Sequence, residues 1–105
     1  MVRGDLHEIN LPARRGHLQH RRRYAVIVQA DDLLALSTVV ICPTSRSDFP
    51  ASFHPEIAVL DEPTQVLCEM VGAIDARALG KRIGHLAHDE MQAVEDALAL
   101  VLDLV

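Results

Sequence analysis

Aromatic residues are scarce in this chain, which has no tryptophan, one tyrosine and two phenylalanines among 105 residues. A hydrophobic core must therefore be built from valine, isoleucine, leucine and alanine. Half of the residues are apolar, which is enough for the chain to fold. A chain of this length can form one core but not two, so we expect a single domain that spans residues 1–105.

Long apolar runs and paired cysteine motifs are also missing. No run reaches the length of a membrane-spanning helix, and the N-terminus has an early acid, Asp5, in place of the apolar segment of a signal peptide. The two cysteines, Cys42 and Cys68, each lie within an apolar run, which is typical of reduced core thiols. We therefore expect a soluble, cytoplasmic protein without a disulfide framework and without contact to a membrane.

Charges of one sign are absent from two stretches of the chain. Residues 11–30 contain no aspartate or glutamate, and residues 88–105 contain five acids but no lysine or arginine. The arginines of the first stretch are Arg14, Arg15, Arg21, Arg22 and Arg23. A net charge of −5 argues against a polyanionic partner, but a segregated basic loop can still bind one locally.

Short β-branched or alternating segments separated by turns predict a mainly β protein. The expected strands cover residues 6–11, 24–30, 37–42, 56–60, 65–70 and 82–86, with one helical turn within 74–80. Pro43 should stop the third strand, because proline cannot donate a ladder hydrogen bond. From residue 89 onward Met91, Val94, Leu98 and Val101 recur at helical spacing. The pattern predicts a small, strongly bent barrel followed by a C-terminal α-helix.

The end of this helix is apolar nearly all round over residues 98–105. Such a surface must be covered by the barrel or by another chain. Because the barrel is too small to cover all of it, we expect a homodimer.

Residues for metal or nucleophilic chemistry lack the spacing that such chemistry requires. His17 and His20 are three residues apart, as are His85 and His88, but no third ligand stands at a diagnostic spacing. Ser45 lacks a Gly-x-Ser-x-Gly context. We therefore expect no metal, no cofactor and no nucleophilic triad.

What remains is a metal-free site for a phosphodiester. Guanidinium groups match phosphate geometry, and His17 in the same loop can titrate near neutral pH. Thr44 and Ser45 offer hydroxyls at the end of the third strand, and Glu69 offers a carboxylate at the end of the fifth. RNA is cleaved by its own 2′-hydroxyl when a base, an acid and fixed positive charge are present, and Glu69, His17 and Arg23 are candidates for these roles. The alternative is a solvated basic loop and a surface carboxylate.

Six segments resemble, in order and spacing, motifs of the MazF/PemK (Kid) family, the toxin halves of bacterial toxin–antitoxin pairs. They are RGDLHEINLP, RGHLQHRRRYAVIVQ, STVVICPTS, VLCEM, IDARALGKRIGHL and DEMQAVEDALALVLDL. The resemblance implies an SH3-like barrel of the CcdB/MazF kind, a homodimer, and a metal-independent, sequence-specific endoribonuclease acting on mRNA or tRNA. It also implies 2′,3′-cyclic phosphate and 5′-hydroxyl ends, and a cognate antitoxin that covers the site.

The resemblance also assigns roles to residues. Arg23 falls on the family's catalytic arginine and Thr44 on its catalytic threonine. His17 and Glu69 fall where plasmid-type members have a histidine and an aspartate proposed as catalytic. The residues expected to contact single-stranded RNA are Arg14, Arg15, Gln19, Arg21, Arg22, Tyr24, Ser45 and Arg46.

The chain departs from the family pattern at several positions that would touch RNA. Tyr24 replaces a proline, Leu18 a glutamate, Met70 a glutamine and Gly72 an arginine, and Leu67 replaces the arginine that would partner the acid at 69. Base specificity therefore cannot be transferred from a relative. Two alternatives stay open: a CcdB-like toxin that binds gyrase without cleaving RNA, and a family member that only binds its antitoxin.

Overall fold

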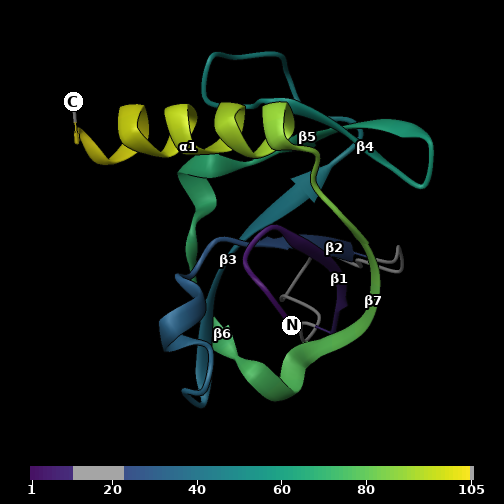
Figure 1. Ribbon diagram of the computed structural model, residues 1–105. Helices are drawn as coiled ribbons and strands as arrows, with labels where there is room; N and C mark the ends of the chain where they lie inside the picture. Colours follow the sequence, from purple (N-terminus) through teal and green to yellow (C-terminus); the bar gives the residue numbers. More distant parts are fainter. Residues whose placement is uncertain (11–22, 105) are drawn as a thin grey trace, which may run out of the picture.

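The structure, a computed structural model, describes residues 1–10 and 23–104, and within these ranges seven strands precede one C-terminal α-helix (Figure 1). The strands are β1 (Asp5–Ile9), β2 (Arg23–Ile27), β3 (Thr38–Ser45), β4 (Glu56–Val59), β5 (Glu62–Val66), β6 (Gly72–Asp75) and β7 (Leu79–His85). The helix is α1 (His88–Leu102), and the short 3₁₀ turns are η1 (Asp31–Leu33), η2 (Cys68–Met70) and η3 (Ala76–Ala78). The predicted mainly β fold with a C-terminal helix is confirmed.

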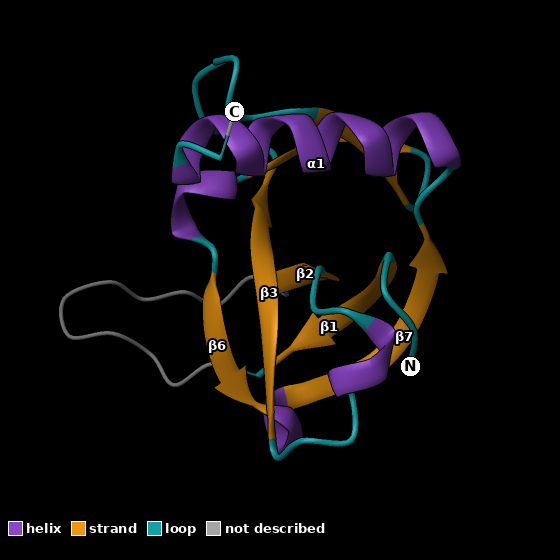
Figure 2. Cartoon of the chain, turned by 60° about the vertical axis from the view of Figure 1, so that its left-hand side comes forward, coloured by secondary structure: helices purple, strands orange, loops and turns teal. Residues whose placement is uncertain are grey.

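The strands are arranged around β3, and all of their pairings are antiparallel. One edge of β3 pairs with β2, which leads on to β1 and β7. The other edge pairs first with β6 through residues 38–41 and then with β5 through residues 44–45. The resulting sheet is curled, and α1 lies across its open top (Figure 2).

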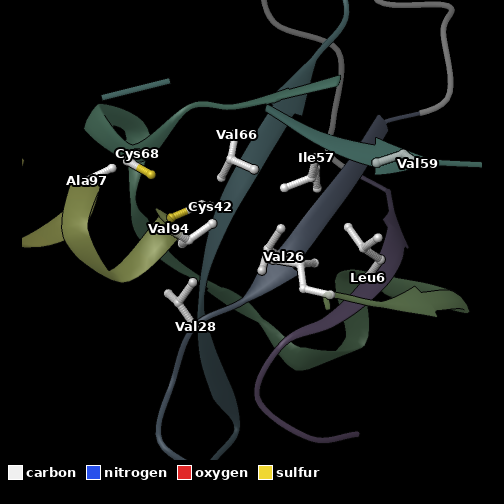
Figure 3. Close-up of a cluster of buried hydrophobic side chains, with 11 residues drawn as sticks. Leu6, Val26, Val28, Cys42, Ile57, Val59, Val66, Cys68, Val94 and Ala97 are labelled. Atoms are coloured by element: carbon white, nitrogen blue, oxygen red, sulfur yellow. The ribbon is translucent and has the colours of Figure 1, made fainter. Parts of the chain in front are cut away.

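The main core is aliphatic, as the shortage of aromatic residues predicts, and it joins the curled sheet to the helix (Figure 3). Val94 and Ala97 of α1 are buried against strand residues such as Val26 and Val66. The complete cluster is Leu6, Val26, Val28, Cys42, Ile57, Val59, Val66, Cys68, Leu86, Val94 and Ala97. Burial of each large side chain contributes roughly 1.5–3 kcal/mol, so the helix is held chiefly by this face.

Polar contacts fix the first turn and the middle of α1 to the rest of the fold. The carboxylate of Glu90 accepts hydrogen bonds from the backbone N–H of Ala87 (2.9 Å) and of Ala58 in β4 (2.8 Å), which ties the first turn of the helix to a strand. Further along, the guanidinium of Arg3 donates to Glu95 at 2.7 Å. Among the described residues, no helix has the length and apolar character needed to cross a membrane.

The prediction that Pro43 stops the third strand is wrong, because β3 continues to Ser45. Pro43 pairs with Ala25 of β2, and its carbonyl accepts a hydrogen bond from the N–H of Leu67 on the opposite edge. Its nitrogen faces the same edge as its carbonyl, at the point where β3 changes partner from β6 to β5. The missing N–H therefore interrupts no hydrogen bond to β2.

The region from residue 60 to residue 80 also differs from the predicted pattern. The fifth strand covers Glu62–Val66 instead of 65–70, since Leu60 and Asp61 have positive φ angles and form a tight hairpin turn directly after β4. Strand β6 is a strand that the prediction missed, because most of its residues are exposed and give no alternating pattern. The expected helical turn is confirmed as the short η3, after which β7 begins at Leu79.

Asp5 anchors the N-terminal segment against β7. Its buried carboxylate accepts hydrogen bonds from the N–H of Val2 (2.8 Å) and from the side chains of Arg82 (3.0 Å) and His85 (2.8 Å). Burial alone would raise the pKa of Asp5, but these hydrogen bonds outweigh it and lower the pKa from 3.8 to about 2. The contacts therefore favour the ionised carboxylate in the folded protein.

Asp5→Asn is expected to lower the free energy of unfolding by about 2 kcal/mol at neutral pH. The reason is that folding lowers the pKa of Asp5, and this stabilises the folded state at any pH above the pKa of Asp5 in the unfolded chain. This contribution is complete above pH 3.8 and is lost as the pH falls toward 2. Urea unfolding at pH 7 and pH 3 measures the effect, and the exposed Asp32→Asn serves as the control. A difference between Asp5→Asn and the unmodified chain that does not shrink on acidification would contradict the assignment.

Candidate active site

The start of β2 and the end of β3 lie side by side, which places the backbone of Arg23 one residue from the point where Tyr24 stands opposite Thr44. Ala25 pairs with Pro43, and one further step of the same register places Tyr24 opposite Thr44. The hydroxyl of Thr44 donates a hydrogen bond to the carbonyl of Tyr24 at 3.0 Å, which confirms that the two strands remain together at this point. Thr44 is buried, and Arg23 is half-buried at the first position of β2. The Thr44 hydroxyl therefore donates its proton to the Tyr24 carbonyl, and its oxygen can still accept a hydrogen bond from another group.

Glu69 lies on η2, which begins beside the same end of β3. The N–H of Leu67 donates to the carbonyl of Pro43 at 2.9 Å, and this bond fixes the entry into η2 one residue from Thr44. Sequence analysis placed Glu69 at the end of a strand, but it lies in the 3₁₀ turn. Its side chain is 38% exposed, so the carboxylate lies at the surface.

His54 is the residue of this site that the sequence analysis missed. Its side chain has no exposed surface, and its Nε2 lies 2.9 Å and 2.8 Å from the two carboxylate oxygens of Glu69. Its Nδ1 lies 2.7 Å from the carbonyl of Phe49. A lone histidine before a proline, fifteen residues from its carboxylate partner, has no spacing that would have indicated this contact. Glu69 thus pairs with His54, although Leu67 stands at the position where the family pattern has an arginine.

The surroundings of His54 favour its charged form. Burial alone would lower the pKa of His54, but the Phe49 carbonyl and the Glu69 carboxylate, together with the nearby charge of Asp48, raise it above its ordinary value. Both ring nitrogens face acceptors, and an imidazole can satisfy both only when each nitrogen carries a proton. These surroundings therefore favour a buried imidazolium next to a surface carboxylate.

Of the expected RNA contacts, Tyr24, Ser45 and Arg46 lie in the described part of the chain. Tyr24 is partly buried against the core, and the Ser45 hydroxyl accepts a hydrogen bond from the N–H of Ser47 at 3.2 Å. The Arg46 guanidinium donates to the carbonyl of Val59 at 3.1 Å and so braces the β4–β5 hairpin. The other expected site residues lie outside the described residues, and they are Arg14, Arg15, His17, Gln19, Arg21 and Arg22.

The two cysteines are core residues, as predicted. Cys42 and Cys68 are both buried and carry free thiols. The hydrogen bond with Cys68 and burial together raise the pKa of the Cys42 thiol, so it stays protonated and is a poor nucleophile. Across residues 1–10 and 23–104, no three His, Cys, Asp or Glu side chains are grouped so that they could hold a metal ion.

The arrangement can move a proton and neutralise negative charge at one end of the sheet. Arg23 supplies a guanidinium, Thr44 a hydroxyl oxygen, and Glu69 a carboxylate whose charge is balanced from behind by His54. These groups come from β2, β3, η2 and the loop before β4, which backbone hydrogen bonds hold together.

Comparison with known proteins identifies the family. Residues 2–102 match the family model described as PemK-like, MazF-like toxin of type II toxin–antitoxin system. A curated Mycobacterium tuberculosis protein named as a toxin is 35% identical over 106 residues, which cover 99% of each chain.

Solved structures show the same fold. A mycobacterial endoribonuclease in complex with its cognate antitoxin superposes with a TM-score of 0.83 at 17% identity, over 100% of this chain and 97% of that one. MazF from Deinococcus radiodurans superposes with a TM-score of 0.81 at 21% identity, over 98% and 96% of the two chains. The chain therefore belongs to the PemK-like, MazF-like family of toxins of type II toxin–antitoxin systems.

Proposed function

We propose that this toxin is an endoribonuclease that cleaves single-stranded RNA in the cytoplasm without a metal or cofactor. The observation that carries the proposal is that the segments bearing Arg23, Thr44 and Glu69, which are far apart in the sequence, meet at one end of the sheet. Membership of the PemK-like, MazF-like toxin family supports the proposal.

In the proposed reaction the RNA supplies its own nucleophile. The 2′-hydroxyl gives its proton to a base, a bond forms between O2′ and phosphorus, and the bond from phosphorus to O5′ breaks as an acid protonates O5′. The products are a 2′,3′-cyclic phosphate and a 5′-hydroxyl. We assign Glu69 as the base, His17 as the acid and Arg23 as the clamp for the charge that develops on the phosphate oxygens.

The direct test is incubation of the purified toxin with a long, defined RNA in EDTA, followed by mapping of the new 5′ ends. Discrete cuts whose 5′ ends accept phosphate from a kinase without prior phosphatase treatment are expected. Cleavage that appears only after a divalent metal is added would overturn the mechanism. Intact RNA together with tight antitoxin binding would instead support a family member that only binds its antitoxin.

The surface near the end of α1 supports the proposal of a homodimer. Leu98 and Val101 pack against the core, so the barrel covers that side of the helix. Leu100, Leu102 and Leu104 stay 53%, 50% and 72% exposed, and Met70 on the adjacent η2 is 52% exposed. These side chains supply the apolar centre of an interface, while the antitoxin is proposed to cover the RNA site.

A dimer mass is expected at micromolar concentration in analytical ultracentrifugation. Leu102→Lys should shift the mass toward the monomer, because a charge buried without a partner at an interface is costly. Leu36→Lys changes an equally exposed leucine on the turn before β3 and should leave the mass unchanged. A monomeric unmodified chain, or equal effects of the two substitutions, would contradict this interface.

A further inference from the structure

His54 occupies an unusual place for a charged side chain, because it is completely buried while its partner Glu69 lies at the surface. Its ring is enclosed by two phenylalanines, with centroids 4.9 Å from Phe49 and 4.7 Å from Phe53. The loop that carries it runs along the end of β5, since Cys68 N–H donates to the Phe53 carbonyl and Val66 N–H to the Pro55 carbonyl. The phenylalanine rings therefore restrict the His54 ring, and the backbone hydrogen bonds hold its loop in place.

The two nitrogens of His54 face two different parts of the molecule. Nδ1 donates to the carbonyl of Phe49 and so belongs to the loop. Nε2 faces both oxygens of Glu69 and so belongs to the site. A role in folding the loop requires only the first contact, whereas a role in the reaction requires the second.

A carboxylate on a 3₁₀ turn at the surface would otherwise sample several rotamers. Ordering a flexible side chain of this kind costs conformational entropy, and misplacing a reacting group by about 1 Å can cost on the order of a hundredfold in rate. A rigid donor that contacts both oxygens removes this freedom before substrate arrives. Its positive charge also replaces the arginine that Leu67 excludes.

We propose that His54 is a positioning residue of the active site, which holds the Glu69 carboxylate from behind in the orientation in which it receives the 2′-hydroxyl proton. This inference rests on the proposed endoribonuclease function. His54 itself touches no substrate, because its side chain has no exposed surface. It acts only through Glu69.

Two amide substitutions separate the two contacts of the ring. His54→Gln places its NH₂ group near the former Nε2 and keeps a donor toward Glu69, whereas His54→Asn reaches only the Phe49 carbonyl. We expect kcat for RNA cleavage to fall at least about tenfold in His54→Asn and less than about threefold in His54→Gln, with little change in KM. Glu62→Gln, an exposed acid on β5, is the matched control.

A double-mutant cycle shows whether His54 acts through Glu69. In a Glu69→Gln background, His54→Asn should cause no further loss of kcat. If the kcat losses of the two substitutions multiply in the double variant, or if His54→Asn lowers kcat less than His54→Gln does, the positioning role is overturned. Either result would leave the endoribonuclease function intact. Absence of cleavage by the unmodified toxin would overturn the proposed function, and the positioning role with it.

A measurement on the unmodified ring covers the case in which a His54 variant fails to fold. Nitrogen-15 NMR of the imidazole should show both ring nitrogens protonated at pH 7.5, and Glu69→Gln should lower the pKa of His54. The other titratable groups that face the ring are Asp48 on its own loop and Cys68 on η2, and both stay in place in this variant. A His54 pKa that Glu69→Gln leaves unchanged would overturn the proposal.

Discussion

Replacing the ribose on the 5′ side of the scissile phosphate with deoxyribose is expected to abolish cleavage at that position. The described part of the toxin offers no activated nucleophile at the site: Cys42 is buried with a raised pKa, and the Thr44 hydroxyl proton is held by the Tyr24 carbonyl. The proposed mechanism therefore takes the attacking oxygen from the RNA itself. A single deoxynucleotide removes that oxygen and leaves every phosphate in place.

Binding separates this effect from simple loss of contact. Since phosphate contacts dominate affinity, fluorescence anisotropy should give dissociation constants within about threefold for the ribose and deoxyribose oligonucleotides. An oligonucleotide with deoxyribose one position away from the cut is the matched control and should still be cleaved. Cleavage at an all-deoxy scissile position would mean that water or a side chain attacks phosphorus, and the mechanism would be wrong.

Arg23→Ala is expected to lower the single-turnover cleavage rate on the order of a hundredfold or more, because a fixed positive charge at the developing phosphorane is lost. Arg23 stands at the first residue of β2, beside the strand end that carries Thr44. Its backbone is therefore held by the sheet, and we propose that its guanidinium acts as the clamp. Rates measured at saturating toxin separate this loss from weaker binding.

Two other arginines provide the comparison. Arg14→Ala should mainly weaken RNA binding and flatten its dependence on salt, as expected for a contact to the phosphate backbone. Arg77→Ala removes an exposed guanidinium that pairs with Asp75 at 2.8 Å, at the end of β3 opposite Thr44, and should change neither rate nor affinity. Small and equal effects at Arg23 and Arg14 would mean that the basic segment is only an electrostatic surface.

Much of the fold could be predicted from local patterns. The β-branched run of β2 is buried on both faces and α1 has a periodic apolar face, so both elements gave clear signals. Strand β6 gave none, because three of its four residues are exposed and its position depends on pairing with β3. The predicted position of β5 was wrong because the start of this strand depends on the positive φ angles of Leu60 and Asp61. The sequence analysis did not predict these angles.

The site was predictable only where a motif marks it. Arg23 and Thr44 stand directly before and at the end of clear strands, and the antiparallel register brings these two strand ends together. The His54–Glu69 pair depends on a loop folding back along β5, which is a tertiary event without a local pattern. The hydrogen bond from the Arg46 guanidinium to the Val59 carbonyl likewise depends on tertiary folding, and the role of Arg46 in RNA contact stays a prediction.

The pairing of β1 with β7 has a consequence for how the toxin is made in the cell. Leu6 pairs with Gly84, and Asp5 accepts hydrogen bonds from Arg82 and His85. Strand β1 therefore cannot complete its pairing until β7 has been made. Until β7 and α1 have left the ribosome, a nascent chain has β1 paired on one edge and no helix over its core. The sheet can therefore close only after β7 has left the ribosome. A premature stop before Leu79 should yield an unstable, harmless fragment.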